Sequence, residues 1–383
     1  MRLDSLWYDA RFSNADVELV DGPGQPSRFT GTGRYTLVTE GVKFDVDLEA
    51  LPLSYTTLSR SYPNMPLRGS AVGRIQATGM ADRFDLNTTL SGEGGEVSFT
   101  GVADALEPVM GAAGEWRVRG GNLQALFGSS TLPTSTLNMA GTVDLTGTVN
   151  ELGVFRNDSF TGPLRATIDQ FSRIADARVF GGSAALRFDQ GVVRVDTLTL
   201  ESSAARLMAR GGVGLTEAKR DSLLLSVHVD SLGGLRPWLS PTDTGKRALV
   251  LPTDTLRGTV EVSGVLRGSI DTLDTRGLDL QLRADVSDLV VASSRSIRTA
   301  FDLDVRDVLR GANGLFTASA DSAYVAGIDV AAATARATLK GGLADRFSFA
   351  LRTPAESRVA IAGGVTRRGD STCLLYTSPS PRD

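Results

Sequence analysis

Few residues of this chain could carry chemistry, and their spacing does not assemble a catalytic site. His228 is the only histidine, and it alternates with apolar residues beside Ser226 and Asp230. One histidine, with no cysteine in residues 1–370, excludes His-rich metal sites and most nucleophile–histidine arrangements. Asp302 and Asp304 share one side of another alternating segment, and paired carboxylates can hydrolyse glycosidic bonds. Because many other Asp residues have the same setting, we expect solvated side chains at both places, with no enzyme activity, catalytic residue, metal or cofactor.

The only cysteine, Cys373, lies in a segment that differs from the rest of the chain. Residues 373–383 resemble the translation of a sequencing adapter, so we expect residues 371–383 to be a non-native, disordered tail. Residues 1–370 hold no cysteine, which excludes disulfides and thiolate metal sites there.

Composition predicts a folded protein without a nucleic-acid partner. Of the 383 residues, 41% are apolar and 22% are charged, values that argue against global disorder. The net charge is −4, and no basic patch stands out. No apolar run approaches the roughly 20 residues that a membrane-spanning helix needs. The first residues, with Asp4 and Asp9, do not match a signal peptide.

Apolar and polar residues alternate in segments along the whole chain. Side chains of a strand point to opposite faces in turn, so each segment predicts a strand with one apolar and one polar face. Such strands are typical of antiparallel sheets. The predicted fold is therefore all-β and mostly antiparallel, with short helices near residues 122–127 and 231–239. The alternating segments are residues 42–49, 84–90, 223–230, 278–287, 301–306 and 347–351.

Glycine-rich turns and a degenerate repeat accompany this pattern. Turns are expected at residues 91–95, 180–182 and 340–342. In residues 193–200 the apolar parity switches, which indicates either a β-bulge near Asp196 or two short strands. The repeat, two glycines that flank a short alternating run, occurs at Gly73–Gly79, Gly141–Gly147 and Gly258–Gly264. Its uneven spacing indicates repeated hairpins within one region, residues 1–370, with a weak boundary near 240–255.

Several of these phrases resemble the AsmA/TamB superfamily, and the resemblance extends over residues 20–365. It implies a periplasmic protein that is anchored in the inner membrane by a segment outside this chain. It further implies a long sheet coiled into an open groove, which conducts phospholipids between the inner and outer membranes and aids outer-membrane biogenesis. The implied partners are phospholipid acyl chains, the inner membrane and an outer-membrane barrel protein. The phrases that carry the resemblance are Leu67–Gly79, Gly191–Ser202, Arg210–Leu215 and Val229–Leu239.

A sheet that is apolar on one face must cover that face, and two kinds of cover are open. Acyl chains would cover it in a lipid groove, at roughly 0.8 kcal/mol per buried methylene. A second layer of protein would cover it in a self-closed structural or adhesive β-repeat at the cell surface. Alternation alone fits both. The residues expected to line a groove are Phe44, Val46, Leu48, Phe84, Leu86, Leu90, Leu280, Leu282, Phe301, Leu303, Phe347 and Phe349.

Overall fold

The computed structural model is all-β, as predicted, with antiparallel strands and short helices. The chain divides into two compact units, residues 1–197 and 198–383. The boundary expected near 240–255 lies outside the residues that the structure describes. The described residues are 8–20, 25–39, 41–61, 67–129, 132–150, 154–175, 177–216, 218–235, 256–269, 278–308, 313–325, 327–341, 343–368 and 371–377.

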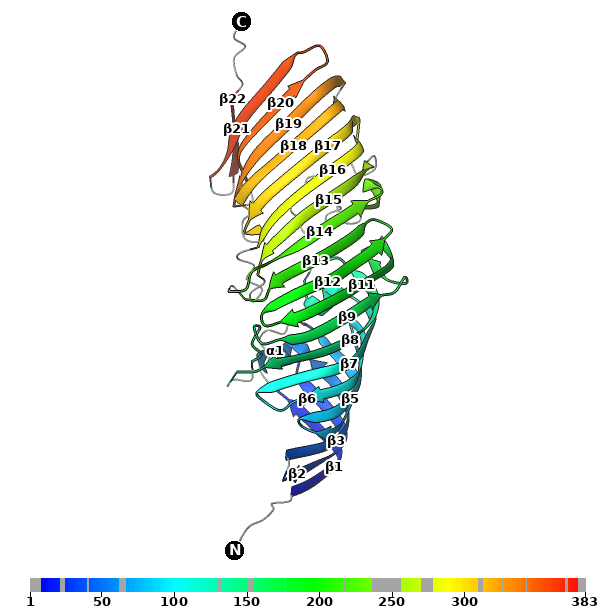
Figure 1. The fold of residues 1–383 in the computed structure, drawn as a ribbon. Coiled ribbons are helices and arrows are strands. Elements are labelled where there is room, and N and C mark those ends of the chain that lie inside the picture. The colour runs from blue at the N-terminus through cyan, green and yellow to red at the C-terminus, as the bar shows by residue number, and fades with distance from the viewer. Residues whose placement is uncertain are drawn as a thin grey trace. The chain divides into compact units, whose positions relative to one another are not determined.

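In the first unit, strands that follow one another in the chain pair with one another (Figure 1). The exception is the two-residue strand β10, which pairs with β8 and β11, while β11 also pairs with β9. The strands are β1 Tyr8–Leu19, β2 Ser27–Val38, β3 Gly41–Ser54, β4 Ser70–Met80, β5 Arg83–Gly92, β6 Gly95–Asp104, β7 Val109–Gly121, β8 Ser135–Thr148, β9 Thr161–Ile168, β10 Arg173–Ile174 and β11 Ala177–Asp189.

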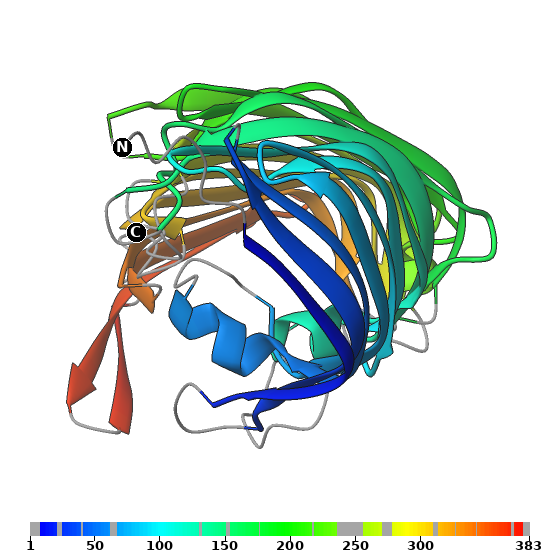
Figure 2. The same ribbon diagram turned by 90° about the horizontal axis from the view of Figure 1, so that it is seen from below.

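Two short helices belong to this unit. The helix α2 (Leu123–Phe127) was predicted; it begins after Asn122, whose side chain accepts a hydrogen bond from the amide of Gln124. The helix α1 (Tyr55–Ser61) was not predicted, and Figure 2 shows it on the concave side of the first strands. Thr57 of α1 is buried and donates a hydrogen bond to the carbonyl oxygen of Gln25 (3.0 Å).

The strand β12 (Val192–Ser202) is one continuous strand, so the alternative of two short strands here is wrong. Asp196 and Thr197 are exposed in succession, which is the parity switch read from the sequence.

In the second unit, consecutive strands from β13 to β22 again pair antiparallel. The 3-10 helix η1 (Leu232–Leu235) follows β14 and falls within the helical segment expected at 231–239, of which residues 236–239 lie outside the described part. The strands are β13 Arg206–Gly214, β14 Asp221–Val229, β15 Arg257–Gly268, β16 Asp279–Val291, β17 Ser294–Arg306, β18 Asn313–Val325, β19 Ile328–Lys340, β20 Leu343–Arg352, β21 Arg358–Arg368 and β22 Ser371–Thr377.

The last strand corrects the expectation of a disordered tail. Residues 371–377 pair with β21 as β22, because strand-favouring residues here follow the open edge of a sheet. Residues 378–383 lie outside the described part, and the foreign origin of the tail stays a prediction.

Two further features were read incompletely from the sequence. Residues 180–182 were expected to form a turn, but they lie inside β11, where the parity of buried residues switches after Val179. In β16, Asp288 has a positive φ of 51°, and Val286 and Leu289 pack into the same apolar cluster although their numbers differ in parity. A single left-handed residue thus reverses the alternation within a strand. The turn expected at 91–95 is present between β5 and β6.

The repeated glycines have a packing reason. Gly141 of β8 lies so close to β9 that a Cβ atom there would be 1.9 Å from the carbonyl oxygen of Arg165. Gly79 of β4 has a φ of 145°, and a Cβ there would be 2.7 Å from the Cα of Phe84. Only glycine fits where neighbouring backbones approach this closely.

Candidate functional site: the apolar sheet faces

All twelve expected lining residues lie on the less exposed face of their strands. Each is half-buried, whereas most of their sequence neighbours, such as Lys43, Asp85 and Gln281, are exposed. The parity read from the sequence is therefore present in both units, and the role of these residues as a groove lining stays a prediction.

In the first unit, Phe44 and Phe84 come from different strands and meet over a glycine. Both stand opposite Gly79 of the intervening strand β4, in the register of β3 and β5. Their ring centroids are 4.9 Å apart in an edge-to-face arrangement, which is favourable for aromatic pairs. Because Gly79 has no side chain, the rings reach across the strand between them.

The same register continues the apolar face from strand to strand. Leu48 stands opposite Ile75, and Leu90 stands opposite Val97. One row, from β1 to β11, consists of Phe12, Gly33, Val46, Ala77, Leu86, Gly101, Gly114, Val143, Leu164 and Leu186.

In the second unit, the six remaining lining residues fall in equivalent rows. Leu280 stands opposite Val305, and Phe349 stands opposite Ala335 and Ile361. Phe301 and Phe316, from β17 and β18, stack with their centroids 6.1 Å apart. One row, from β13 to β21, consists of Ala209, Leu225, Gly264, Leu282, Leu303, Phe316, Ala337, Phe347 and Gly363.

A few residues of these faces are buried, such as Ala77 and Ala209 within the rows. In the second unit, Val229, Val260 and Val286 form a buried cluster against which Leu232 and Leu235 of η1 pack. Away from this cluster the lining side chains keep part of their surface exposed among the described residues. Each face therefore offers apolar surface that a ligand could still remove from water.

The opposite faces are polar, and their side chains form ion pairs and hydrogen bonds between neighbouring strands. In the first unit, Arg74 forms a bidentate ion pair with Asp47, and this pair lowers the pKa of Asp47. In the second unit, Arg283 lies near Asp302 (3.6 Å), and Gln281 donates to Asp304 (3.2 Å). Asp302 and Asp304 thus belong to the cross-strand polar contacts of this face, as expected of outward carboxylates.

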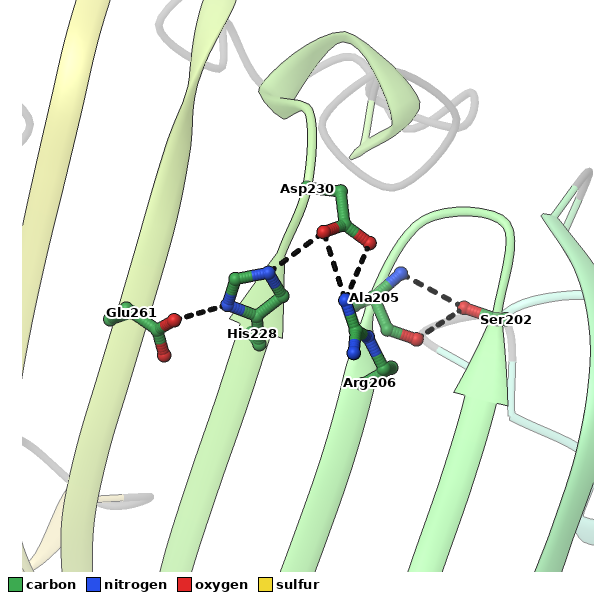
Figure 3. Close-up of polar contacts among 6 residues, drawn as sticks. All are labelled: Ser202, Ala205, Arg206, His228, Asp230 and Glu261. Atoms are coloured by element: carbon green, nitrogen blue, oxygen red, sulfur yellow. Dashed lines mark hydrogen bonds and ion pairs between the residues drawn. The ribbon is translucent and has the colours of Figure 1, made fainter.

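His228 has more partners than the sequence indicated. Its Nε2 is 2.8 Å from Asp230, its Nδ1 contacts Glu261, and Arg206 donates to both oxygens of Asp230 (3.0 and 3.2 Å; Figure 3). The register forces this arrangement, because Arg206, His228 and Glu261 stand opposite one another on β13, β14 and β15.

Hydrogen bonds to Asp230, and then to Glu261, raise the pKa of His228. A protonated imidazole donates from both nitrogens, so the cationic form suits two carboxylate partners. The cluster has no nucleophile, and the described residues hold no group of three or more acidic, histidine or cysteine ligands for a metal ion.

A hollow of about 660 Å³ lies elsewhere in the second unit, at one end of β16–β19. The guanidinium of Arg295 lies 5.6 Å from the ring centre of Tyr324 there. Its lining includes serines and aspartates but no histidine, lysine or cysteine, so the continuous apolar faces are the stronger candidate site.

Sequence reading missed several aromatic residues of the apolar faces. Phe99 and Trp116 stand opposite each other in the row of Leu48, and Phe316 stands opposite Leu303. The pairing register with neighbouring strands, which a single sequence does not give, is the signal that identifies these residues.

No family model, curated protein or solved structure matches the chain. No described helix is both long enough and apolar enough to cross a membrane.

Proposed function

We propose that the apolar sheet faces bind the acyl chains of phospholipids, and that the protein is a non-enzymatic lipid-conducting scaffold of the cell envelope. The observation that supports this proposal is the row of apolar residues and glycines, with no polar residue among them, that crosses successive strands in each unit. Acyl chains need continuity of apolar surface and no specific polar partner. A face built from Leu, Val, Phe, Ala and Gly has this property.

The resemblance to the AsmA/TamB superfamily supports the same proposal. On that basis we propose a periplasmic location, with the inner membrane and an outer-membrane barrel protein as partners. The half-exposed lining favours a lipid over a second layer of protein, because a self-closed structural repeat would leave this face dry and fully packed.

The test is native mass spectrometry with lipid extraction on the full chain purified from a bacterial periplasm. We expect phospholipid to co-purify, and we expect the double variant Leu280→Asp/Leu282→Asp to lose it. The matched control is Gln281→Asp/Ser287→Asp, which adds the same charge to the opposite face of the same strand. A folded, lipid-free protein would contradict the proposal and favour the self-closed structural repeat.

A further inference from the structure

The hollow at one end of β16–β19 lies where the alternation of side chains reverses in neighbouring strands. Asp288 of β16 and Ser322 of β18 have positive φ angles, 51° and 53°, and each is exposed directly after another exposed residue. Ile297 of β17 lies between these two residues in the register and is 64% exposed. Because a left-handed residue exchanges the two faces of a strand, the reversal runs as one line across the sheet.

Beyond this line, two adjacent rows of residues face opposite sides of the sheet. Ala323 and Val330 stand opposite each other and are buried. The next row holds Arg295 of β17, Tyr324 of β18 and Asp329 of β19, which stand opposite one another in that order. Arg295 and Asp329 are exposed. The reversal therefore places this charged row on the other face from the apolar lining.

Three charged groups line the hollow without pairing with one another. In the part of the chain that the structure describes, neither Arg295 nor Asp288 nor Asp329 forms an ion pair. The guanidinium of Arg295 lies 5.6 Å from the ring centre of Tyr324, a cation–π contact that holds it beside the hollow. Single unpaired charges are ordinary on a surface. Here charges of both signs converge on about 660 Å³, a volume typical of small-molecule sites.

The spacing of the strands sets the distance between the charges of a matching ligand. Arg295 and Asp329 stand two strands apart, which is about 9.6 Å. A charge-assisted hydrogen bond of about 2.8 Å at each end leaves about 4 Å between a positive and a negative group of the ligand. An ammonium and a carboxylate on one carbon atom, or the two charges of phosphoethanolamine, are separated by about this much.

We propose that this hollow binds a small zwitterion, which is a free α-amino acid or the phosphoethanolamine group of a lipid. The guanidinium of Arg295 binds the anionic oxygens, and the carboxylate of Asp329 binds the ammonium, with Asp288 as a second carboxylate at the hollow. Ile297 and Pro354 line the hollow as well and offer contact to an apolar part of the ligand. This inference goes beyond the proposed function, since it concerns the face opposite to the apolar rows.

The experiment is a ligand-observed NMR titration of the full chain with L-leucine and with glycerophosphoethanolamine. Isoamylamine and 4-methylpentanoate, which are L-leucine without its carboxylate and without its ammonium, should each bind about tenfold more weakly than L-leucine. Arg295→Gln and Asp329→Asn should each weaken zwitterion binding about tenfold, because each removes one charge-assisted hydrogen bond. Arg306→Gln and Asp345→Asn, which make the same changes at exposed positions of the second unit, should bind like the parent chain.

Three outcomes would overturn the proposal: a folded parent chain that binds neither zwitterion, equal binding of the singly charged analogues, or undiminished binding in Arg295→Gln or Asp329→Asn. Circular dichroism checks that each variant is folded. Tighter binding of L-leucine assigns the hollow to free amino acids, and tighter binding of glycerophosphoethanolamine assigns it to lipid head groups. Both hollow variants should keep their co-purified lipid, and Leu280→Asp/Leu282→Asp should keep zwitterion binding, so failure of this inference is distinguishable from failure of the proposed function.

Discussion

The two units share one alternation of apolar and polar residues but place their large side chains differently. In the first unit, aromatic rings lie against glycine, as Trp116 does against Gly141 and Phe99 against Gly114. In the second unit, Phe316 stands opposite Ala337, and Phe301 stands opposite Ala284 and Ala318. A ring beside glycine can rest on the neighbouring backbone, whereas a ring beside alanine must stand over a methyl group. Alternation therefore selects the face, and the size of the cross-strand neighbour decides how the side chain lies on it.

The largest expected effect is the loss of stability when a glycine beside an aromatic ring of the first unit is replaced by alanine. Gly141→Ala would place a methyl group 1.9 Å from the carbonyl oxygen of Arg165 and 2.8 Å from the Trp116 ring. We expect a loss of about 2–4 kcal/mol in the free energy of unfolding, measured by chemical denaturation. Gly181→Ala is the control, because its Cβ would meet nothing within 4 Å. Ala337→Gly should cost only about 0.5–1 kcal/mol. Equal losses in Gly141→Ala and Gly181→Ala would refute the packing reason.

A second comparison, within β17, is between a side chain that packs inside the protein and a side chain that lines the proposed lipid-binding face. Val305 is 2% exposed, whereas Leu303, on the same face, is half-buried. We expect Val305→Ala to lower the free energy of unfolding by about 2 kcal/mol and Leu303→Ala by about 1 kcal/mol. The order should reverse in lipid extraction, where Leu303→Ala lowers the yield of co-purified lipid more. A larger stability loss in Leu303→Ala would mean that this face is covered by protein in solution.

Buried threonines should respond in opposite directions in the two units. Thr299 is 6% exposed and its hydroxyl has no hydrogen-bond partner among the described residues, whereas the Thr57 hydroxyl donates to a carbonyl oxygen. We expect Thr299→Val to raise the free energy of unfolding by about 1 kcal/mol and Thr57→Val to lower it by about the same amount. Thermal denaturation of both variants tests this, and destabilisation by Thr299→Val would show that its hydroxyl is satisfied.

The smallest effect is a difference in pH dependence. The pKa of His228 is raised, so its stabilising contribution is complete below the unfolded-state pKa of about 6.5 and is lost as the pH rises through the higher folded-state pKa. The pKa of Asp47 is lowered, so its contribution is present above the ordinary pKa and is lost only as the pH falls through the folded-state value. Near neutral pH, the stability contribution of His228 in the second unit should therefore change with pH, whereas that of Asp47 in the first unit should stay constant.

Proton NMR measures this directly, since the chain has a single histidine. The pKa of His228 should exceed 6.5 and should fall more in Asp230→Asn than in Glu261→Gln. Asp285, which stands opposite Glu261, and Arg206 are the other charged groups of this row. An unshifted pKa in the parent chain would contradict the geometry of the cluster.

The sequence predicted the strands and the faces, because both follow from a period of two residues. It did not predict α1, because a seven-residue helix rich in Thr and Ser has no apolar periodicity. It read Gly181 and Gly182 as part of a turn, because a glycine pair fits a turn and a parity switch equally well. It could not find the partners of His228, since Glu261 is 33 residues away and only the pairing register brings it close.

The predominance of pairing between strands that are neighbours in sequence has a consequence for how such a chain can evolve. Each hairpin depends on the one before and the one after it, so inserting or deleting a hairpin leaves the register of distant pairs intact. Since strands are spaced about 4.8 Å apart, one added hairpin lengthens an apolar face by about 10 Å. The span of the face is thus a quantity that gene duplication can adjust in fixed steps, without redesign of any existing strand.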